Sequence, residues 1–396
     1  MQKARRLTAL CLASLLLATA FTGCSNKAED SPTAGSAANG AKSIPTYKLG
    51  LLAPITGTNA EYGAGFQVAT QMAVDEINAK GEMKLEIVVK DSKGDTKESA
   101  DLARQFGDDS SVMAIIGDFT SSCCMANAPI VDEAGIVQLS PTASNPKYAS
   151  MSKYCFSIMG RQDGEAPFFS TYLLKKYAGA TNVGIIWVNS DWGKSAHDNF
   201  TKQAEADGLK VVADVNYVAD EKDFSSAIAK LRSAKPDHIV IMDQGAVPTI
   251  INQISAANWT DVKITTLGPG TSPQLLTLAG KNAEGLLLST PFMIDATNAK
   301  AKKWSEDFTA KAGFGPTVHP ACAYDCVYLI EAAIKASGST VTRDSIRDNL
   351  QDLKGFTGLT GPIQFNKDRD ITRKYLVVSV DNGQYAQRTN YDYATQ

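Results

Sequence analysis

Three consecutive hydroxyl side chains follow an apolar run in the first third of the chain. Thr120, Ser121 and Ser122 stand where the run 112–116 gives way to a helix that we expect to begin near Cys123. Such hydroxyls cap the first N–H groups of a helix, and together with those groups they form a site for a small anion such as a carboxylate. The helix dipole contributes roughly 0.3–1 kcal/mol and each hydrogen bond to a charged oxygen about 1.5–3 kcal/mol, so the hydroxyls would dominate the affinity. Capping without a ligand is the alternative interpretation.

A second polar loop follows the next apolar run, 136–139. It adds Thr142 and Ser144 as hydrogen-bond donors, and Pro141 and Pro146 restrict its backbone on both sides. Because ligands of doubly wound sheets lie outside the carboxyl ends of the strands, both loops are candidates for one binding site. A rigid polar turn without a ligand is the alternative.

Two segments of the chain begin alike. Residues 49–66, LGLLAPITGTNAEYGAGF, and residues 183–196, VGIIWVNSDWGKSA, each give a strand, a polar loop, an aromatic-glycine pair and a helix. The match predicts two lobes of one design, whose cleft would receive Tyr62 and Trp192 near helix N-termini. Alternatively, each aromatic residue only secures the start of its own helix.

The elements that must position these residues alternate in the manner of βαβ units. Short apolar runs predict strands at 47–53, 84–90, 112–116, 136–139, 183–188, 210–217, 238–242 and 263–267. Amphipathic segments predict helices at 63–80, 97–106, 193–207, 224–233 and 247–257. The sequence therefore predicts an α/β fold of two doubly wound, Rossmann-like lobes with parallel sheets.

The first 23 residues predict an export signal, because three basic residues precede an apolar stretch at 7–20 and a small-residue cleavage site. That stretch is short for a membrane span. Cys24 follows directly and resembles the lipidated cysteine of the bacterial lipobox, although Phe21 stands where that pattern usually has Leu. Residues 24–45 then predict a lipid anchor and a flexible tether, because they contain few large apolar side chains. An ordinary secretory signal is the alternative.

Composition argues against several kinds of partner. The formal net charge is −3, and loss of a signal with three basic and no acidic residues would change it to −6. This acidic balance and the absence of a basic stripe argue against nucleic acid. Removal of 23 of the 396 residues leaves 373, enough for two domains with substantial cores.

Neither a metal, a cofactor nor an enzymatic function is expected. Three scattered histidines and five cysteines without zinc-site spacing favour free, partly buried thiols, although one disulfide involving Cys155 remains open. Gly57, Gly63 and Gly65 have the wrong spacing for a dinucleotide-binding turn. The chain also has no sequence typical of a nucleophile elbow with supporting histidine and acid.

Several motifs together resemble one family, the type I periplasmic binding proteins of ABC transporters, and within it the branched-chain amino-acid-binding class. They occur in the family's order and cover the chain from about residue 47: APITGTNAEYGAGF, AVDEINAKG, AIIGDFTSSCC, VDEAGIVQLSPTASNP, SDWGKSAHDNF, AYDCVYLIEAAIKASG and GLTGPIQFNKDRD. The resemblance implies two lobes joined by three crossover strands, near Arg161, Pro291 and Asn366. Lobe one would combine 46–161 with 294–366, and lobe two 162–293 with 367–396.

The resemblance also implies which residues bind a ligand. Ser121 matches the family's carboxylate-binding serine, and Ser144 matches its second hydroxyl donor, with a backbone contact near Thr142. Tyr62 and Trp192 match the two aromatic positions that close over the ligand. Thr120 and Ser122 complete the candidate set beside Ser121.

One position departs from the family. Gly270 stands where amino-acid binders often have a Glu that pairs with the ligand's ammonium. A buried ammonium without a countercharge would lose several kcal/mol, so another acid replaces Glu or the ligand is not a plain α-amino acid. Asp243 is the first candidate acid, and Asp118 and Asp325 are weaker ones. Gln244 beside Asp243 could bind an amide, so amides, urea-like molecules and small carboxylates are alternative ligands.

The resemblance implies a receptor rather than an enzyme. It would be a lipid-anchored protein on the outer face of the cytoplasmic membrane, or in the periplasm, that closes over an amino acid or similar small solute. It would deliver this solute to an ABC permease and ATPase complex. Closure requires a ligand that contacts both lobes, because contact with one lobe alone does not shift the equilibrium. A subunit that reports to a membrane sensor is the alternative.

Overall fold

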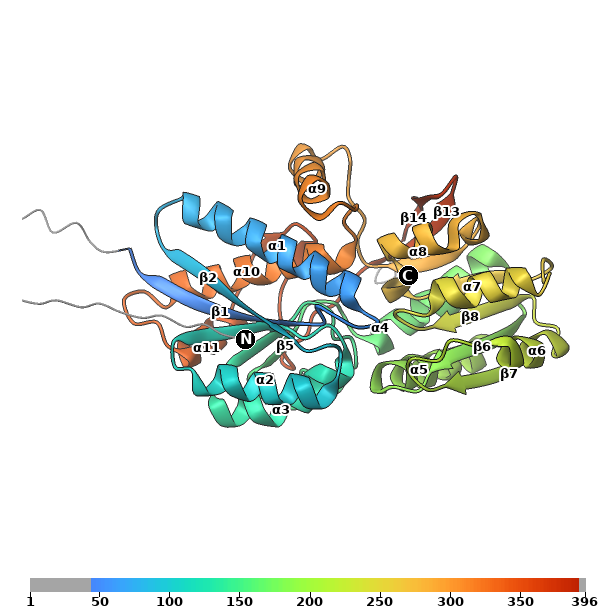
Figure 1. The fold of residues 1–396 in the computed structure, drawn as a ribbon, viewed down its shortest axis with the longest axis horizontal. Coiled ribbons are helices and arrows are strands. Elements are labelled where there is room, and N and C mark those ends of the chain that lie inside the picture. The colour runs from blue at the N-terminus through green and yellow to red at the C-terminus, as the bar shows by residue number, and fades with distance from the viewer. Residues whose placement is uncertain (1–43, 392–396) are drawn as a thin grey trace, which may run out of the picture. The chain divides into compact units, whose positions relative to one another are not determined.

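Parallel strands form a five-stranded sheet, sheet A, in the N-terminal half of the part that the computed structural model describes, residues 44–391 (Figure 1). Its strand order is β2-β1-β3-β4-β5, and every neighbouring pair is parallel. The strands are β1 (Thr46–Ala53), β2 (Lys84–Asp91), β3 (Val112–Gly117), β4 (Val137–Ser140) and β5 (Cys155–Ser157). The loops after β3 and β4 carry the predicted hydroxyls at one edge of the sheet.

A seven-stranded sheet, sheet B, has the order β14-β13-β10-β9-β8-β6-β7. The strands β6 to β10 pair in parallel, whereas β13 and β14 add an antiparallel hairpin at one edge. Their bounds are β6 (Asn182–Val188), β7 (Lys210–Tyr217), β8 (His238–Met242), β9 (Lys263–Thr266), β10 (Leu287–Thr290), β13 (Tyr375–Asp381) and β14 (Gln384–Tyr391). The predicted α/β class with parallel sheets is confirmed.

Helices cover both faces of sheet A. Figure 1 shows α1 and α10 on one face and α2 and α3 on the other. Their bounds, with two further helices of this part, are α1 (Ala60–Ala79), α2 (Thr96–Asp108), α3 (Ser121–Ala134), α9 (Ala299–Ala312), α10 (Val318–Ala336) and α11 (Arg343–Gln351). A small hairpin, β11 (Phe356–Gly358) and β12 (Gly361–Ile363), follows α11.

Sheet B is also covered on both faces, with a separate hydrophobic cluster on each. One cluster contains α5 (Asp191–Asp207) and the π-helix Phe168–Ala178, and the other contains α6, α7 and α8. The remaining elements are α4 (Gln162–Pro167), α6 (Ser225–Ser233), α7 (Val247–Ala256), α8 (Pro273–Ala279) and 3₁₀ turns at Gly268–Gly270 and Gly280–Ala283. The five helices predicted by range are present, with ends within three residues of the prediction, and the helix expected near Cys123 is α3, which begins at Ser121.

The chain passes between the sheets three times. It leaves sheet A after β5, returns to the helices of sheet A after β10, and enters sheet B again after β12. We call sheet A with α1–α3 and α9–α11 lobe A, and sheet B with α5–α8 lobe B. The passages lie near Arg161, Pro291 and Asn366, while the residue-level lobe boundaries stay a prediction. From Ile44 onward the chain forms one compact unit, so contacts between the lobes are part of its structure.

The predicted export signal, the predicted lipidation site Cys24 and nearly all of the predicted tether lie outside the described residues. Between residues 44 and 391, no helix combines the length and apolar character that a membrane span requires. The five cysteines of this part are free and buried: Cys123, Cys124, Cys155, Cys322 and Cys326. In the same residues, no group of three or more His, Cys, Asp or Glu side chains is arranged so that it could bind a metal ion.

Candidate functional site

Two glycines explain the repeated aromatic-glycine pair. A Cβ at Gly63 would overlap the carbonyl oxygen of Pro54 after β1, and a Cβ at Gly193 would overlap that of Val188 at the end of β6. The first turn of each helix therefore packs directly on the end of the preceding strand, where only glycine fits. This packing fixes the positions of Tyr62 and Trp192 at the carboxyl ends of the two sheets.

Tyr62 connects the two lobes. Its ring stacks on Phe119 with 4.1 Å between centroids, and its hydroxyl donates to the carbonyl oxygen of Gln244 in lobe B at 2.6 Å. The imidazole of His319 packs edge-on against the Tyr62 ring at 5.0 Å. Full burial lowers the pKa of His319 to about 3, so this ring is neutral, and its Nε2 has no hydrogen-bond partner among residues 44–391. Tyr62 thus belongs to an aromatic cluster of lobe A that reaches lobe B through one hydroxyl.

Trp192 makes the reciprocal connection from lobe B. Its indole Nε1 donates to Ser144 Oγ of lobe A at 3.0 Å, and the indole is almost fully buried. Its carbonyl oxygen accepts a hydrogen bond from Gln162 Nε2 at 3.0 Å. The structure therefore brings Trp192 and Ser144 together, as expected for two sides of one cleft.

The three hydroxyls at the start of α3 have different partners. Thr120 Oγ1 accepts from the backbone N–H of Cys123 at 3.2 Å and is the N-cap of α3. Ser122 Oγ accepts from the N–H of Asp191 in lobe B at 3.3 Å. Ser121 is fully buried, and its Oγ accepts from the N–H of Asn145 at 3.3 Å. Capping therefore accounts for Thr120 but not for its two neighbours.

Ser121 and Ser144 share one property. Each hydroxyl accepts one hydrogen bond, and no contact in residues 44–391 gives its own proton an acceptor. Ser121 is 0% exposed and Ser144 is 5% exposed. Thr142, by contrast, donates to the carbonyl oxygen of Phe119 at 2.6 Å and is used inside lobe A. Two buried O–H donors thus remain at the loops where the lobes meet.

Asp243 lies at the predicted edge, immediately after β8. Its carboxylate accepts from the Tyr217 hydroxyl at 2.7 Å, from the N–H of Gly245 at 2.5 Å and from the N–H of Ala246. These bonds hold the turn that presents the carbonyl of Gln244 to Tyr62. A carboxylate has about four acceptor sites, so Asp243 keeps room for one further donor.

The local structure explains why position 270 is a glycine. It lies in a 3₁₀ turn, and a Cβ there would lie 2.5 Å from Thr266 Cγ2. Thr266 is itself held, because its hydroxyl donates to the carbonyl oxygen of Ile241 at 2.8 Å. A side chain at position 270 would require movement of this turn. Glu165 lies next to the same turn, since a Cβ at Gly268 would lie 3.9 Å from its Oε1. It accepts a hydrogen bond from Ser289 Oγ, and burial raises its pKa to about 7.

The two weaker acid candidates accept hydrogen bonds from other residues of the same part of the chain, within lobe A and its β11–β12 hairpin. Asp118 is fully buried and accepts from Ser99 Oγ at 2.8 Å; burial raises its pKa to about 6. Asp325 accepts from the N–H groups of Leu359 and Thr360 and so joins α10 to the β11–β12 hairpin. Both carboxylates are used by the fold.

Sequence reasoning missed several polar residues near the cleft. Asn145 Nδ2 donates to the carbonyl oxygen of Asp191 across the lobes at 3.0 Å. The Oε1 of Gln162 and the Oδ1 of Asn59 are buried and have no hydrogen-bond partner in the part of the chain that the structure describes. Asn59 and Asn145 lie within quoted motifs, but their types and spacing alone do not show that they are buried or that Asn145 contacts the other lobe.

Two doubly wound lobes, joined by three passages and meeting at the carboxyl ends of their strands, define a two-lobed solute-binding protein. Residues 46–384 match the family model described as periplasmic binding protein. The chain therefore belongs to the periplasmic binding protein family, as its motifs predicted.

Similar proteins cover most of the chain. The "Leu/Ile/Val-binding protein BraC3" of Rhizobium johnstonii is 26% identical over 332 residues, which cover 82% of this chain and 88% of the relative. A leucine-, isoleucine-, valine-, threonine- and alanine-binding protein of Pseudomonas aeruginosa is 25% identical over 336 residues, covering 82% and 87%. The crystal structure of the Streptococcus pneumoniae binding protein LivJ in complex with isoleucine has a TM-score of 0.80 at 28% identity, covering 87% and 99%.

Proposed function

We propose that this protein is the substrate-binding subunit of an ABC importer and captures a small carboxylate-bearing solute, most simply a branched-chain or other amino acid. The observation that carries the proposal is the pair of buried O–H donors, Ser121 and Ser144, at the loops where the lobes meet. The relatives named as Leu/Ile/Val-binding proteins support the choice of solute.

A carboxylate suits these two donors. Each hydrogen bond from a hydroxyl to a charged oxygen is worth about 1.5–3 kcal/mol, and the N-terminus of α3 adds roughly 0.3–1 kcal/mol. The bonds from Tyr62 to Gln244 and from Trp192 to Ser144 belong to the form in which the lobes are in contact. A solute that contacts both lobes would add its binding energy to that form and shift the equilibrium toward it.

Asp243 is the acid that we propose for an ammonium group. It lies beside Gln244, and the donors it already accepts leave further acceptor capacity. If the solute lacks an ammonium, as amides, urea-like molecules or simple carboxylic acids do, Asp243 serves only the turn after β8. The Asp243→Asn variant separates these cases. It should weaken the binding of leucine more than the binding of 4-methylpentanoate, which has the same carbon skeleton but no ammonium group. Equal losses would remove Asp243 from the site.

The central test is the Ser121→Ala variant. The ligand is first identified by thermal shifts of unfolded and refolded protein with amino acids, amides, urea and short carboxylic acids, because a ligand of the native state raises its stability. Loss of one charge-assisted hydrogen bond should then lower the affinity for that ligand about ten- to a hundredfold, as measured by calorimetry. Ser150→Ala, an exposed hydroxyl of lobe A, is the control and should leave the affinity unchanged. Unchanged affinity in Ser121→Ala would refute the assignment.

The anchor is part of the same proposal. A receptor held at the outer face of the cytoplasmic membrane by lipid on Cys24 would stay near its permease and ATPase while its lobes open and close. Intact-mass measurement of membrane-extracted protein should show a chain that begins at a lipidated Cys24. An unmodified or uncleaved chain would contradict the anchor but not the solute site.

A further inference from the structure

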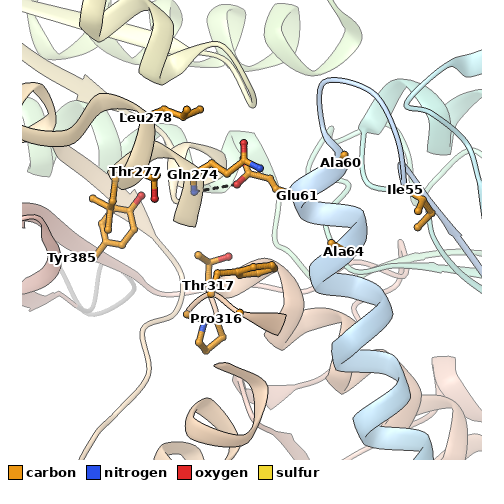
Figure 2. A pocket seen from close by; sticks show the side chains of 14 residues that line it. Ile55, Ala60, Glu61, Ala64, Gln274, Thr277, Leu278, Pro316, Thr317 and Tyr385 are labelled. Atoms are coloured by element: carbon orange, nitrogen blue, oxygen red, sulfur yellow. Dashed lines mark hydrogen bonds between the residues drawn. The ribbon is translucent and has the colours of Figure 1, made fainter. Parts of the chain in front are cut away.

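A pocket of about 950 Å³ lies between α1, α8 and the loop before α10 (Figure 2). Its volume falls within the ≈ 300–1,000 Å³ that small-molecule sites occupy. Both lobes form its walls, yet none of the predicted solute-binding residues lines it. Lobe A contributes Ile55, Ala60, Glu61, Ala64 and residues 313–317, and lobe B contributes Gln274, Leu276, Thr277, Leu278 and Tyr385.

Glu61 is the acidic group of this pocket. Ser272 Oγ donates to its carboxylate and lies 2.7 Å from each oxygen, and the N–H of Gln274 donates at 3.2 Å, the bond drawn in Figure 2. No Lys, Arg or His in residues 44–391 forms an ion pair with it within 4.0 Å. Burial raises the pKa of Glu61, and the two hydrogen bonds only partly oppose this effect. The pocket thus contains a half-buried carboxylate that forms no ion pair with a basic side chain of residues 44–391.

The remaining walls are mainly apolar. Ile55 and Ala64 come from lobe A, Leu276 and Leu278 come from α8, and Phe314 lies in the loop before α10. Leu278 is 56% exposed, a large exposed area for a leucine side chain. The aromatic ring of Phe314 would also favour a cation placed over its face. A molecule with an apolar body and one positive charge would bury these side chains and neutralise Glu61.

We propose that this pocket is a second binding site for a small organic cation with an apolar group, such as an arylalkylammonium ion. Its ammonium group would pair with Glu61, while its apolar group would pack on Ile55, Leu278 and Phe314. Because α1 belongs to lobe A and α8 to lobe B, a bound cation would also hold these two helices together. It would therefore favour the form in which the lobes are in contact, without occupying the solute cleft.

Two probes of the same shape test the charge requirement. The 2-phenylethylammonium ion and neutral 2-phenylethanol are titrated into the full chain by calorimetry and by NMR. The cation should bind at least about tenfold more tightly than the alcohol. This factor lies between the gain in affinity expected from an exposed charge pair and that expected from a buried one. Glu61→Gln should abolish this preference, whereas Glu98→Gln, in the first turn of α2, should preserve it. Equal binding of both probes, or a preference that survives Glu61→Gln, would overturn the proposal.

A second variant tests the location. Ala64→Leu fills the pocket from α1 but leaves Glu61 in place, so it should weaken the cation about tenfold or more if the pocket is the site. Gln71→Leu, at an exposed position of the same helix, is the matched control for the added leucine. Circular dichroism and thermal unfolding identify any variant that fails to fold. Retained cation binding in folded Ala64→Leu would overturn the proposed location. Ser121→Ala should leave cation binding unchanged, so this proposal and the solute site fail separately.

Discussion

At the scale of single residues, the two aromatic-glycine corners act as a reciprocal pair. Tyr62 of lobe A donates to the backbone of lobe B, and Trp192 of lobe B donates to Ser144 of lobe A. Gly63 and Gly193 make this possible, because each allows its helix to begin against the end of the preceding strand. Tyr62 and Trp192 therefore do more than secure their own helix starts, because each contacts the other lobe, while their contact with a ligand stays a prediction.

The glycines give a prediction about stability. Gly63→Ala and Gly193→Ala should each lower the free energy of unfolding by about 1–3 kcal/mol, the usual cost of overpacking, because the new methyl group would overlap a backbone carbonyl oxygen. Urea unfolding followed by circular dichroism measures the loss. Gly164→Ala, where a Cβ meets nothing within 4 Å, is the control. Losses no larger than that of the control would contradict the packing argument.

At the scale of elements, one arginine ties α11 to three other elements of lobe A. The guanidinium group of Arg343 donates to five backbone carbonyl oxygens, those of Phe106, Gly107, Asp109, Val112 and Ala134. These carbonyls belong to the C-terminal ends of α2 and α3 and to the start of β3. A cation is favourable there, because helix C-termini carry partial negative charge.

Arg343→Lys should therefore destabilise lobe A. A lysine has no planar fork and cannot reach five carbonyls at once, so we expect a loss of about 3 kcal/mol in the free energy of unfolding. Arg347→Lys on the same helix is the control, because Arg347 pairs with the exposed side chains of Asp344 and Asp348. Chemical denaturation of both variants decides the matter, and equal losses would show that the carbonyl contacts contribute little.

At the scale of the whole molecule, buried carboxyl groups lie near two of the three passages between the lobes. Glu165 follows the first passage, and Asp370 lies in the third. Burial raises the pKa of each to about 7, and the nearby Arg161 only partly offsets this for Asp370. The regions that join the lobes therefore contain groups that protonate near neutral pH.

This arrangement predicts a pH dependence. The folded protein binds these two protons more tightly than the unfolded chain, so their contribution to stability is complete below about pH 4 and is lost as the pH rises to about 7. The double variant Glu165→Gln/Asp370→Asn should lose this dependence, and its stability relative to the wild type should increase between pH 4 and 7. Urea unfolding at several pH values measures the difference, with Glu133→Gln, at an 80% exposed side chain, as the control. A constant difference between double variant and wild type would contradict the prediction.

Much of the fold could be read from local pattern. The strands 183–188 and 238–242 and the helix at 193–207 follow from apolar runs and helical periodicity, which depend on neighbouring residues alone. The π-helix Phe168–Ala178 and the hairpin β13–β14 were not predicted. A π-helix differs from an α-helix in its hydrogen-bond register rather than in its apolar pattern, and the hairpin is specified by its pairing with β10.

By itself, the sequence determined the α/β class, the repeated aromatic-glycine corner and the hydroxyl-rich loops, because local composition and spacing encode all three. Tertiary structure decided how those loops are used: Thr120 caps α3, whereas Ser121 and Ser144 keep buried donors. The tertiary structure also explains why a glycine is required at position 270, and it places Glu61 in the wall of a pocket. Glu61 depends on partners far away in the chain, at the start of α8, and Gly270 depends on Thr266, whose hydroxyl is held by the distant carbonyl oxygen of Ile241. Only folding brings such partners within contact distance.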